Sequence, residues 1–127
     1  MTRTFIFQTA LAATLATAGQ AAAQSFYDGP FPQQGGEAIY KGICQDCHMP
    51  DGHGGIGAGA YPALIKNPKL SEPGYPVSVV VHGQKAMPPF GASLNDQQIA
   101  DVVNYVREHF GNSYKDKVTP ADVKAAR

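Results

Sequence analysis

The stretch CQDCH at residues 44–48 decides how this chain folds, and it holds the only two cysteines of the 127 residues. Residues three and four positions apart on a helix lie on the same side. If the stretch is helical, the thiols of Cys44 and Cys47 and the imidazole of His48 therefore converge on one face.

That arrangement is the attachment signature for c-type haem. Two thiols can add across the haem vinyl groups while the neighbouring imidazole reaches the iron. The sequence therefore predicts one covalently bound haem c as the cofactor, held by Cys44 and Cys47, with His48 as an iron ligand.

Two other kinds of site share this spacing. A redox-active dithiol or a disulfide suits an oxidising compartment, but the dithiol motif is expected after a strand, among alternating strands and helices. A structural zinc site needs four ligands, often in paired Cys or His spacings, and no second pair follows residues 44–48 at a suitable distance. Both alternatives stay open, and both fit the chain less well than haem does.

The stretch MPPF at residues 87–90 supplies the second candidate iron ligand. A thioether on the other side of the iron favours the ferrous state and closes the site to small ligands, and the prolines stiffen the backbone around Met87. A methionine more often fills a gap in a core, but beside the haem motif we predict that Met87 binds the iron. His82 is the alternative ligand because it lies five residues before Met87, whereas Met49 adjoins His48 and cannot reach the opposite face.

The N-terminus has the layout of a secretory signal. Arg3 precedes an uncharged apolar run over residues 5–18, and three alanines follow at residues 21–23. We therefore predict that residues 1–23 are a signal peptide and that export precedes haem attachment. The apolar run is short and alanine-rich for a membrane span, so no span is expected after cleavage, and an uncleaved anchor is the alternative.

Charge and composition narrow the possible partners. Ten basic and ten acidic residues give a formal net charge of zero, and the absence of a basic stripe makes nucleic acid an unsuitable partner. A protein partner must recognise a local patch rather than a strong global field. The chain is one domain long, has no tryptophan and is rich in glycine and proline, so a bulky apolar cofactor would complete its modest core.

Apolar periodicity predicts two helices. Residues 24–35 are interpreted as an extended leader, after which Ile39 and Ile43 share the face of a helix that runs into the haem motif. The last helix begins after Asn95, with Gln98 three positions later as a capping box requires. Its apolar face and its end are marked by Ile99, Val102, Val103, Val106, Phe110 and Gly111.

Three other segments are less regular. The glycine-rich residues 50–60 predict an irregular loop. Residues 77–82 fit a strand by their β-branched side chains and a short helix by their flanking proline and glycine. Thr119 and Pro120 predict a short helix that runs toward Arg127.

From about residue 36 to residue 111 the chain resembles the class I cytochromes c. Beyond the haem motif, Gly36 and Tyr40 match the small residue and the aromatic residue of that family's first helix. Val102 and Tyr105 match the positions on the last helix that cross the first, where the glycine permits close approach of the backbones.

This resemblance implies an all-α, cytochrome c-like fold with three main helices around one haem. The cytochrome c domain then covers residues 36–111, residues 112–127 form a C-terminal extension with a short helix, and residues 77–82 are helical rather than extended. Tyr61-Pro62-Ala63-Leu64 resembles the family segment whose proline carbonyl accepts a hydrogen bond from the iron-binding histidine. The implied partner of His48 is therefore the carbonyl of Pro62.

More narrowly, the chain is similar to small cytochromes that are acceptors or subunits of bacterial periplasmic dehydrogenases. The implied function is that of a periplasmic electron carrier, not itself an enzyme. It would take electrons from a dehydrogenase and pass them toward a downstream cytochrome or terminal oxidase of the respiratory chain. A haem-based sensor or peroxidase-like enzyme with an open iron site is one alternative, and a haem-free CxxC thiol oxidoreductase is another.

Overall fold

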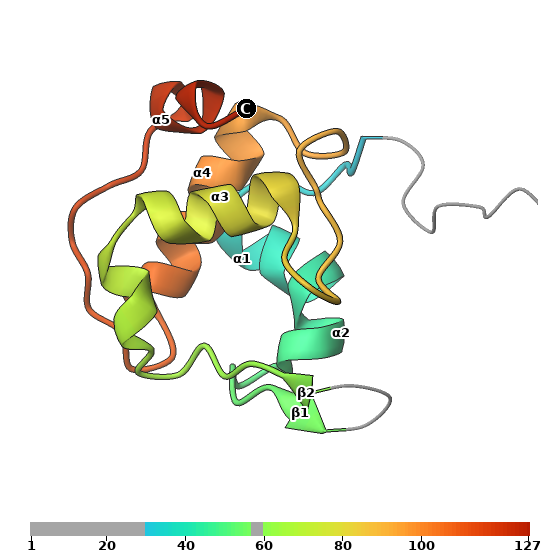
Figure 1. Cartoon of the computed structure of the whole chain (residues 1–127), viewed down its shortest axis with the longest axis vertical. Helices are drawn as coiled ribbons and strands as arrows, with labels where there is room; N and C mark the ends of the chain where they lie inside the picture. Colours follow the sequence, from blue (N-terminus) through green and yellow to red (C-terminus); the bar gives the residue numbers. More distant parts are fainter. Residues whose placement is uncertain (1–29, 57–59) are drawn as a thin grey trace, which may run out of the picture.

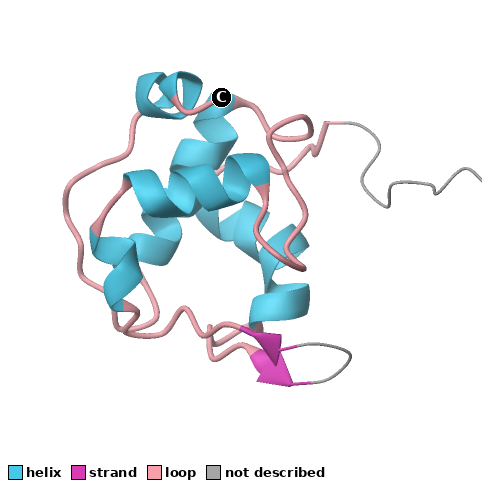
Figure 2. Cartoon of the chain, viewed as in Figure 1, coloured by secondary structure: helices cyan, strands magenta, loops and turns pink. Residues whose placement is uncertain are grey.

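The computed structural model describes residues 30–56 and 60–127, so the proposed signal peptide and the first half of the proposed leader, residues 24–29, lie outside the described residues. The described chain is mostly helical, with one small sheet (Figures 1 and 2). Its elements in order are α1 (Gly36–Ile39), the π-helix η1 (Tyr40–Cys44), α2 (Gln45–His48), β1 (Gly55–Ile56), β2 (Ala60–Tyr61), the 3-10 helix η2 (Pro68–Ser71), α3 (Gly74–His82), α4 (Asp96–Glu108) and α5 (Pro120–Ala125).

The predicted first helix is present and runs without a break from α1 through η1 into α2. Its middle turn is a π-helix, which the sequence did not indicate. The extra residue in such a turn rotates all following side chains about the helix axis. The orientation of residues 45–48 relative to the buried Ile39 of α1 therefore depends on η1.

Helices α1 and α4 cross at Gly36, as the resemblance implied. A Cβ atom on Gly36 would lie only 2.2 Å from the carbonyl oxygen of Asp101 and 2.5 Å from the Cβ of Tyr105. No side chain fits there, so glycine allows the two backbones to approach. One turn further on, the rings of Tyr40 and Tyr105 pack with their centroids 5.6 Å apart.

The capping box of α4 is present. Asn95 accepts a hydrogen bond from the backbone of Gln98, whose side chain accepts one in return. Most of the buried core is aliphatic and comes from all the main helices: Ile39, Ile43, Leu70, Val77, Val81, Leu94, Ile99, Ala100, Val102, Val103, Val106, Val118 and Val123, together with Tyr40 and Phe90.

The predicted end of this helix was wrong by two residues. The helix ends at Glu108, and Phe110 lies beyond it with a φ of 57°. The cause is Asn112, whose side-chain amide donates to the carbonyl of Val106, the acceptor that the backbone of Phe110 would need to continue the helix. Phe110 still packs on the core, with its ring centroid 4.9 Å from that of Tyr40.

The glycine-rich segment is not wholly irregular, so that prediction also needs correction. β1 and β2 pair as antiparallel strands, with Ile56 opposite Ala60. The pair depends on Gly54, because a Cβ at that position would lie 2.2 Å from the carbonyl oxygen of Tyr61. Residues 77–82 are helical and form most of α3, as the resemblance implied.

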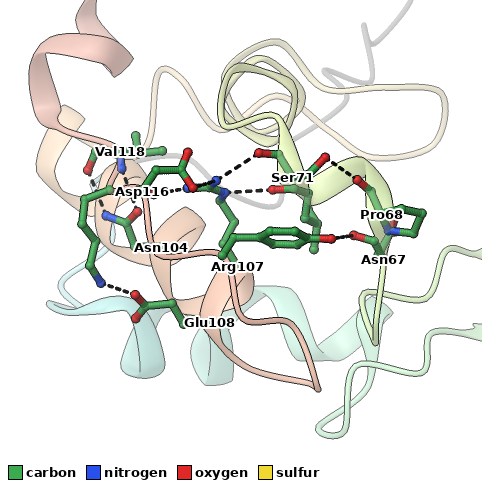
Figure 3. A network of polar contacts seen from close by, with 11 residues as sticks. Asn67, Pro68, Ser71, Asn104, Arg107, Glu108, Asp116 and Val118 are labelled. Carbon is green, nitrogen blue, oxygen red and sulfur yellow. Dashed lines mark hydrogen bonds and ion pairs between the residues drawn. The ribbon is translucent and has the colours of Figure 1, made fainter.

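Residues 112–127 pack back onto the domain (Figure 3). The guanidinium of Arg107, with a side chain only 1% exposed, donates to the carbonyl oxygens of Leu70 and Ser71 at 2.9 and 3.2 Å and to both the carbonyl and the carboxylate of Asp116. Asn104 exchanges two hydrogen bonds with the backbone of Val118. The chain from α4 to α5 is thus held to α4, and through Arg107 to η2, by half-buried polar contacts.

Replacing Gly36 by alanine is expected to lower the free energy of unfolding by about 2 kcal/mol, because α1 and α4 must separate to admit the methyl group. Gly74 is the matched control, since it also begins a helix but has no atom within 4 Å of an added Cβ. Gly74→Ala should leave stability unchanged or raise it by about 0.5–1 kcal/mol. Urea unfolding of the haem-loaded protein measures both, and equal effects would contradict the close crossing.

The ion pair between Arg107 and Asp116 predicts a pH dependence of stability. The hydrogen bond from Arg107 holds the pKa of the Asp116 carboxyl below its ordinary value. A lowered pKa in the folded state adds stability above the unfolded-state pKa of about 3.9, and that stability is lost as pH falls through the folded-state pKa. Asp116→Asn should therefore be less stable than the parent at pH 7, with the gap closing below about pH 4.

Glu72→Gln is the control for that comparison, since the exposed carboxylate of Glu72 forms no ion pair with any residue in the described part of the chain. In thermal unfolding, Glu72→Gln should have the same stability as the parent both at pH 7 and below about pH 4. A gap for Asp116→Asn that stays constant down to pH 3 would show that the charge of Asp116 contributes nothing.

Candidate haem site

The two cysteines lie within one turn of the first helix. Cys44 is the last residue of η1 and Cys47 lies in α2, and both are half-buried free thiols. Burial first, and then the nearby Cys47 and Asp46, raise the pKa of the Cys44 thiol to about 12. A thiol in this state is a poor nucleophile at neutral pH, whereas reactive cysteines of redox enzymes have lowered pKa values. The raised pKa of Cys44 therefore does not favour a dithiol oxidoreductase.

His48 follows directly and is already oriented by a hydrogen bond. Its Nδ1 lies 3.0 Å from the carbonyl oxygen of Pro62. A carbonyl can only accept, so Nδ1 carries the hydrogen and Nε2 keeps a lone pair, which is the form that binds a metal. The structure thus contains the hydrogen bond that the resemblance implied between these two residues.

Two glycines that the sequence analysis did not single out bring Pro62 to His48. Gly54 donates its backbone N–H to the carbonyl of His48 at 3.0 Å and leaves room for the backbone of residues 61–62. The carbonyl of Gly52 accepts from the backbone of both Leu64 and Ile65. The only signal in the sequence was the density of glycines, which does not tell which of them contact which strand.

The helix ends at His48 because the next residue leaves the helical region. Met49 has a φ of 65°, and its carbonyl accepts a hydrogen bond from the hydroxyl of Tyr40 at 2.7 Å. Burial raises the pKa of Tyr40, so this hydroxyl stays protonated and remains a donor. Tyr40 therefore holds the chain just beyond His48.

Met87 lies in a separate segment, the loop of residues 83–95 between α3 and α4, which we call the Met87 loop. Gln84 and Met87 exchange two backbone hydrogen bonds of 3.0 Å across a tight turn. The hydroxyl of Tyr75 donates to the side chain of Gln84 at 3.2 Å. A Cβ on Gly83 would lie 2.6 Å from the carbonyl oxygen of Met87, so the loop doubles back closely on itself. The thioether of Met87 thus comes from a backbone held in one conformation.

The donor set fits a haem c. Haem c is attached through two thiols three residues apart, and its iron is ligated by an imidazole and a thioether. The site offers both thiols, an imidazole whose Nδ1 is hydrogen-bonded to Pro62, and a thioether on a second segment. Cys44, Leu64, Val80 and Met87 pack against the core while keeping part of their surface uncovered, which provides apolar contact for a large apolar ring. Among residues 30–56 and 60–127 no cluster of three or more His, Cys, Asp or Glu side chains gathers to hold a metal ion.

The other histidines have partners elsewhere. His82 was the alternative iron ligand, and its Nε2 lies 2.7 Å from the carbonyl oxygen of Ala126, so that nitrogen already has a partner. His109 Nδ1 lies 2.7 Å from the carbonyl of Tyr105, on whose ring it stacks. His53 is exposed and lies beside Asp51. These contacts favour Met87 over His82 as the second ligand.

Comparison with known families supports this geometry. Residues 32–106 match the family described as cytochrome C oxidase, cbb3-type, subunit III. The chain belongs to the cytochrome c family. The cofactor of that family is haem c, and the cytochrome c-like fold predicted from the sequence is confirmed.

Several relatives of this cytochrome are cytochrome subunits of dehydrogenases. The chain is 39% identical over 105 residues to the cytochrome c subunit of the alcohol dehydrogenase (quinone) of Gluconacetobacter polyoxogenes, covering 72% of this chain and 22% of the relative. It is 35% identical over 109 residues to the gluconate 2-dehydrogenase cytochrome c subunit of Pantoea cypripedii, covering 74% and 24%. The cytochrome therefore spans about a quarter or less of these relatives' length.

A shorter relative matches over nearly its whole length. Cytochrome c6 of Aphanizomenon flos-aquae is 35% identical over 82 residues, covering 63% of this chain and 93% of the relative. Together with the dehydrogenase subunits above, this relative confirms the resemblance to electron-transfer cytochromes at the level of the family.

No helix within the described residues has the length and apolar character to cross a membrane.

Proposed function

We propose that this cytochrome carries one covalently attached haem c and moves single electrons from a periplasmic dehydrogenase to a downstream cytochrome or terminal oxidase. The observation that carries the proposal is the hydrogen bond from His48 Nδ1 to the carbonyl of Pro62. His48 directly follows Cys47, the second of the two free thiols. The hydrogen bond leaves Nε2 available as an iron ligand at the place where the thiols would hold the cofactor.

Each protein group has a definite role in this proposal. The S–H groups of Cys44 and Cys47 would each add across one vinyl double bond of the haem, forming one C–S bond and one C–H bond per thiol with no oxidant. His48 Nε2 and the Met87 sulfur would bind the iron, and the Pro62 carbonyl raises the basicity of the imidazole. When bound, the haem supplies a one-electron couple, whose potential a thioether ligand raises.

The same arrangement favours a carrier over an enzyme. With His48 and Met87 both bound to the iron, the site would be closed to small ligands. The names of the relatives support a dehydrogenase as the electron donor, since the matched subunits belong to an alcohol dehydrogenase and a gluconate dehydrogenase. The signal layout of residues 1–23 supports the periplasm as the compartment.

Optical spectra of Met87→Leu test the ligand assignment. The near-red sulfur-to-iron band of the ferric protein should disappear, the potential should fall, and the ferrous form should take up carbon monoxide. Met49→Leu is the matched control, because it removes the only other thioether of the described residues while leaving the Met87 loop intact. It should keep the band and exclude carbon monoxide.

Other spectra would replace this proposal with a specific alternative. A c-type spectrum that lacks the band in the parent, with ready carbon monoxide binding, would indicate a sensor or an enzyme with an open iron. A colourless protein with two titratable thiols, purified from a host with haem-attachment machinery, would indicate a thiol oxidoreductase.

Rapid mixing tests the electron donor. The oxidised cytochrome should be reduced when a quinone-dependent alcohol or gluconate dehydrogenase and its substrate are present together, but not by either alone. Because the chain has a formal net charge of zero, or −1 once the proposed signal peptide with Arg3 is removed, the rate should depend only weakly on ionic strength. Ready chemical reduction of the cytochrome with no reduction by either dehydrogenase would contradict the proposed donors.

A further inference from the structure

The two ends of the Met87 loop are held by the last residues of the chain. At one end, His82 closes α3 and its Nε2 donates to the carbonyl of Ala126 at 2.7 Å. At the other end, the guanidinium of Arg127 donates to the carbonyls of Gly91 and Leu94, the latter at 2.8 Å, and to the carboxylate of Asp96 at 2.6 Å. Two consecutive residues thus contact both places where the loop leaves its helices.

These contacts come from an element that is itself firmly anchored. Thr119 and Asp122 form a capping box at the start of α5. Val123 on that helix is fully buried, and Val118 just before it is held by two hydrogen bonds with Asn104 of α4. Residues 126–127 therefore connect the loop to α4 rather than lying loosely on it.

Arginine suits the second contact better than lysine would. The planar guanidinium of Arg127 reaches three acceptors in different directions, from Gly91, Leu94 and Asp96. A lysine ammonium carries the same charge as a point and does not reproduce this fork. One of these acceptors, the carbonyl of Gly91, lies near the end of α3. The backbones are close there, because an added Cβ on Gly91 would lie 2.8 Å from the carbonyl oxygen of Val81.

We propose that α5 and Arg127 act as a clamp that positions Met87 on the iron, an inference that rests on the iron ligation proposed above. A thioether binds iron weakly. The fraction of molecules in which the Met87 sulfur is bound therefore depends on how rarely the Met87 loop opens locally. The clamp lowers the population of open loop by holding both of its ends. It also keeps the imidazole of His82 on Ala126 and away from the iron. Arg127 is a positioning residue in this scheme, since it acts through the Met87 loop.

Arg127→Gln in the haem-loaded protein tests the clamp. In a urea titration, the near-red band of the variant should be lost at a lower urea concentration than its helical ellipticity. Ferrous carbon monoxide uptake, which requires Met87 to leave the iron, should be up to about tenfold faster at pH 7, because hydrogen bonds from a charged donor contribute on that order and solvent weakens those at the surface. Arg127→Lys should fall between the variant and the parent.

Lys124→Gln is the matched control. It removes one positive charge from an exposed side chain of α5, the helix that precedes Arg127, and has no contact with either end of the loop. It should match the parent in both measurements. If Arg127→Gln does not fold, His82→Ala releases the other end of the loop and should shift both measurements in the same direction.

Failure of the clamp is distinguishable from failure of the ligand assignment. If the parent shows the near-red band and Arg127→Gln takes up carbon monoxide no faster than Lys124→Gln, Met87 ligation stands and the clamp is wrong. If band and ellipticity are lost together in Arg127→Gln at an unchanged carbon monoxide rate, Arg127 has only a structural role, which also overturns the clamp. If the parent itself lacks the band, Met87 is not the ligand and both proposals fall.

Discussion

The close crossing of α1 and α4 at Gly36 is the contact on which the rest of this structure depends. The carbonyl of Asp101 occupies the space where a Cβ would lie, so the two helices meet backbone to backbone. One of them continues through the π-helical turn into the thiols and His48. The other carries the side chains that hold the C-terminal segment. A shift at the crossing would therefore move the haem-binding residues and the C-terminal helix relative to each other.

A second constraint is the need to satisfy the backbone of long irregular segments in a small domain. Carbonyl groups removed from water must find donors. Arg107 supplies them for residues of η2 and for Asp116, and Asn112 supplies them for Leu64 and Val106. These polar side chains are buried for that reason, and they hold together segments with little apolar surface to bury.

The candidate site follows the same division between rigid and loop-borne parts. His48 belongs to a helix and has its proton position set by Pro62. Met87 belongs to a loop whose conformation depends on its own turn, on Tyr75 and on the C-terminal residues. In an electron carrier, a ligand set that moves little between oxidation states lowers the cost of each transfer. The contacts around Met87 therefore bear on function even though they lie outside the ligand set.

The sequence by itself determined the haem motif, the capping box of Asn95 and the start of a helix at Thr119, because each rests on residues within a few positions of one another. It also indicated the family, through the haem motif together with matching residues further along the chain. Residues 77–82 could not be assigned from their own pattern, because β-branched side chains fit a strand as well as a helix in so short a run. Only the tertiary structure decided the π-helical turn, the strand pair around Gly54, the early end of α4 and the contacts of Arg127. Each of these depends on a partner distant in sequence or on backbone spacing that no local pattern encodes.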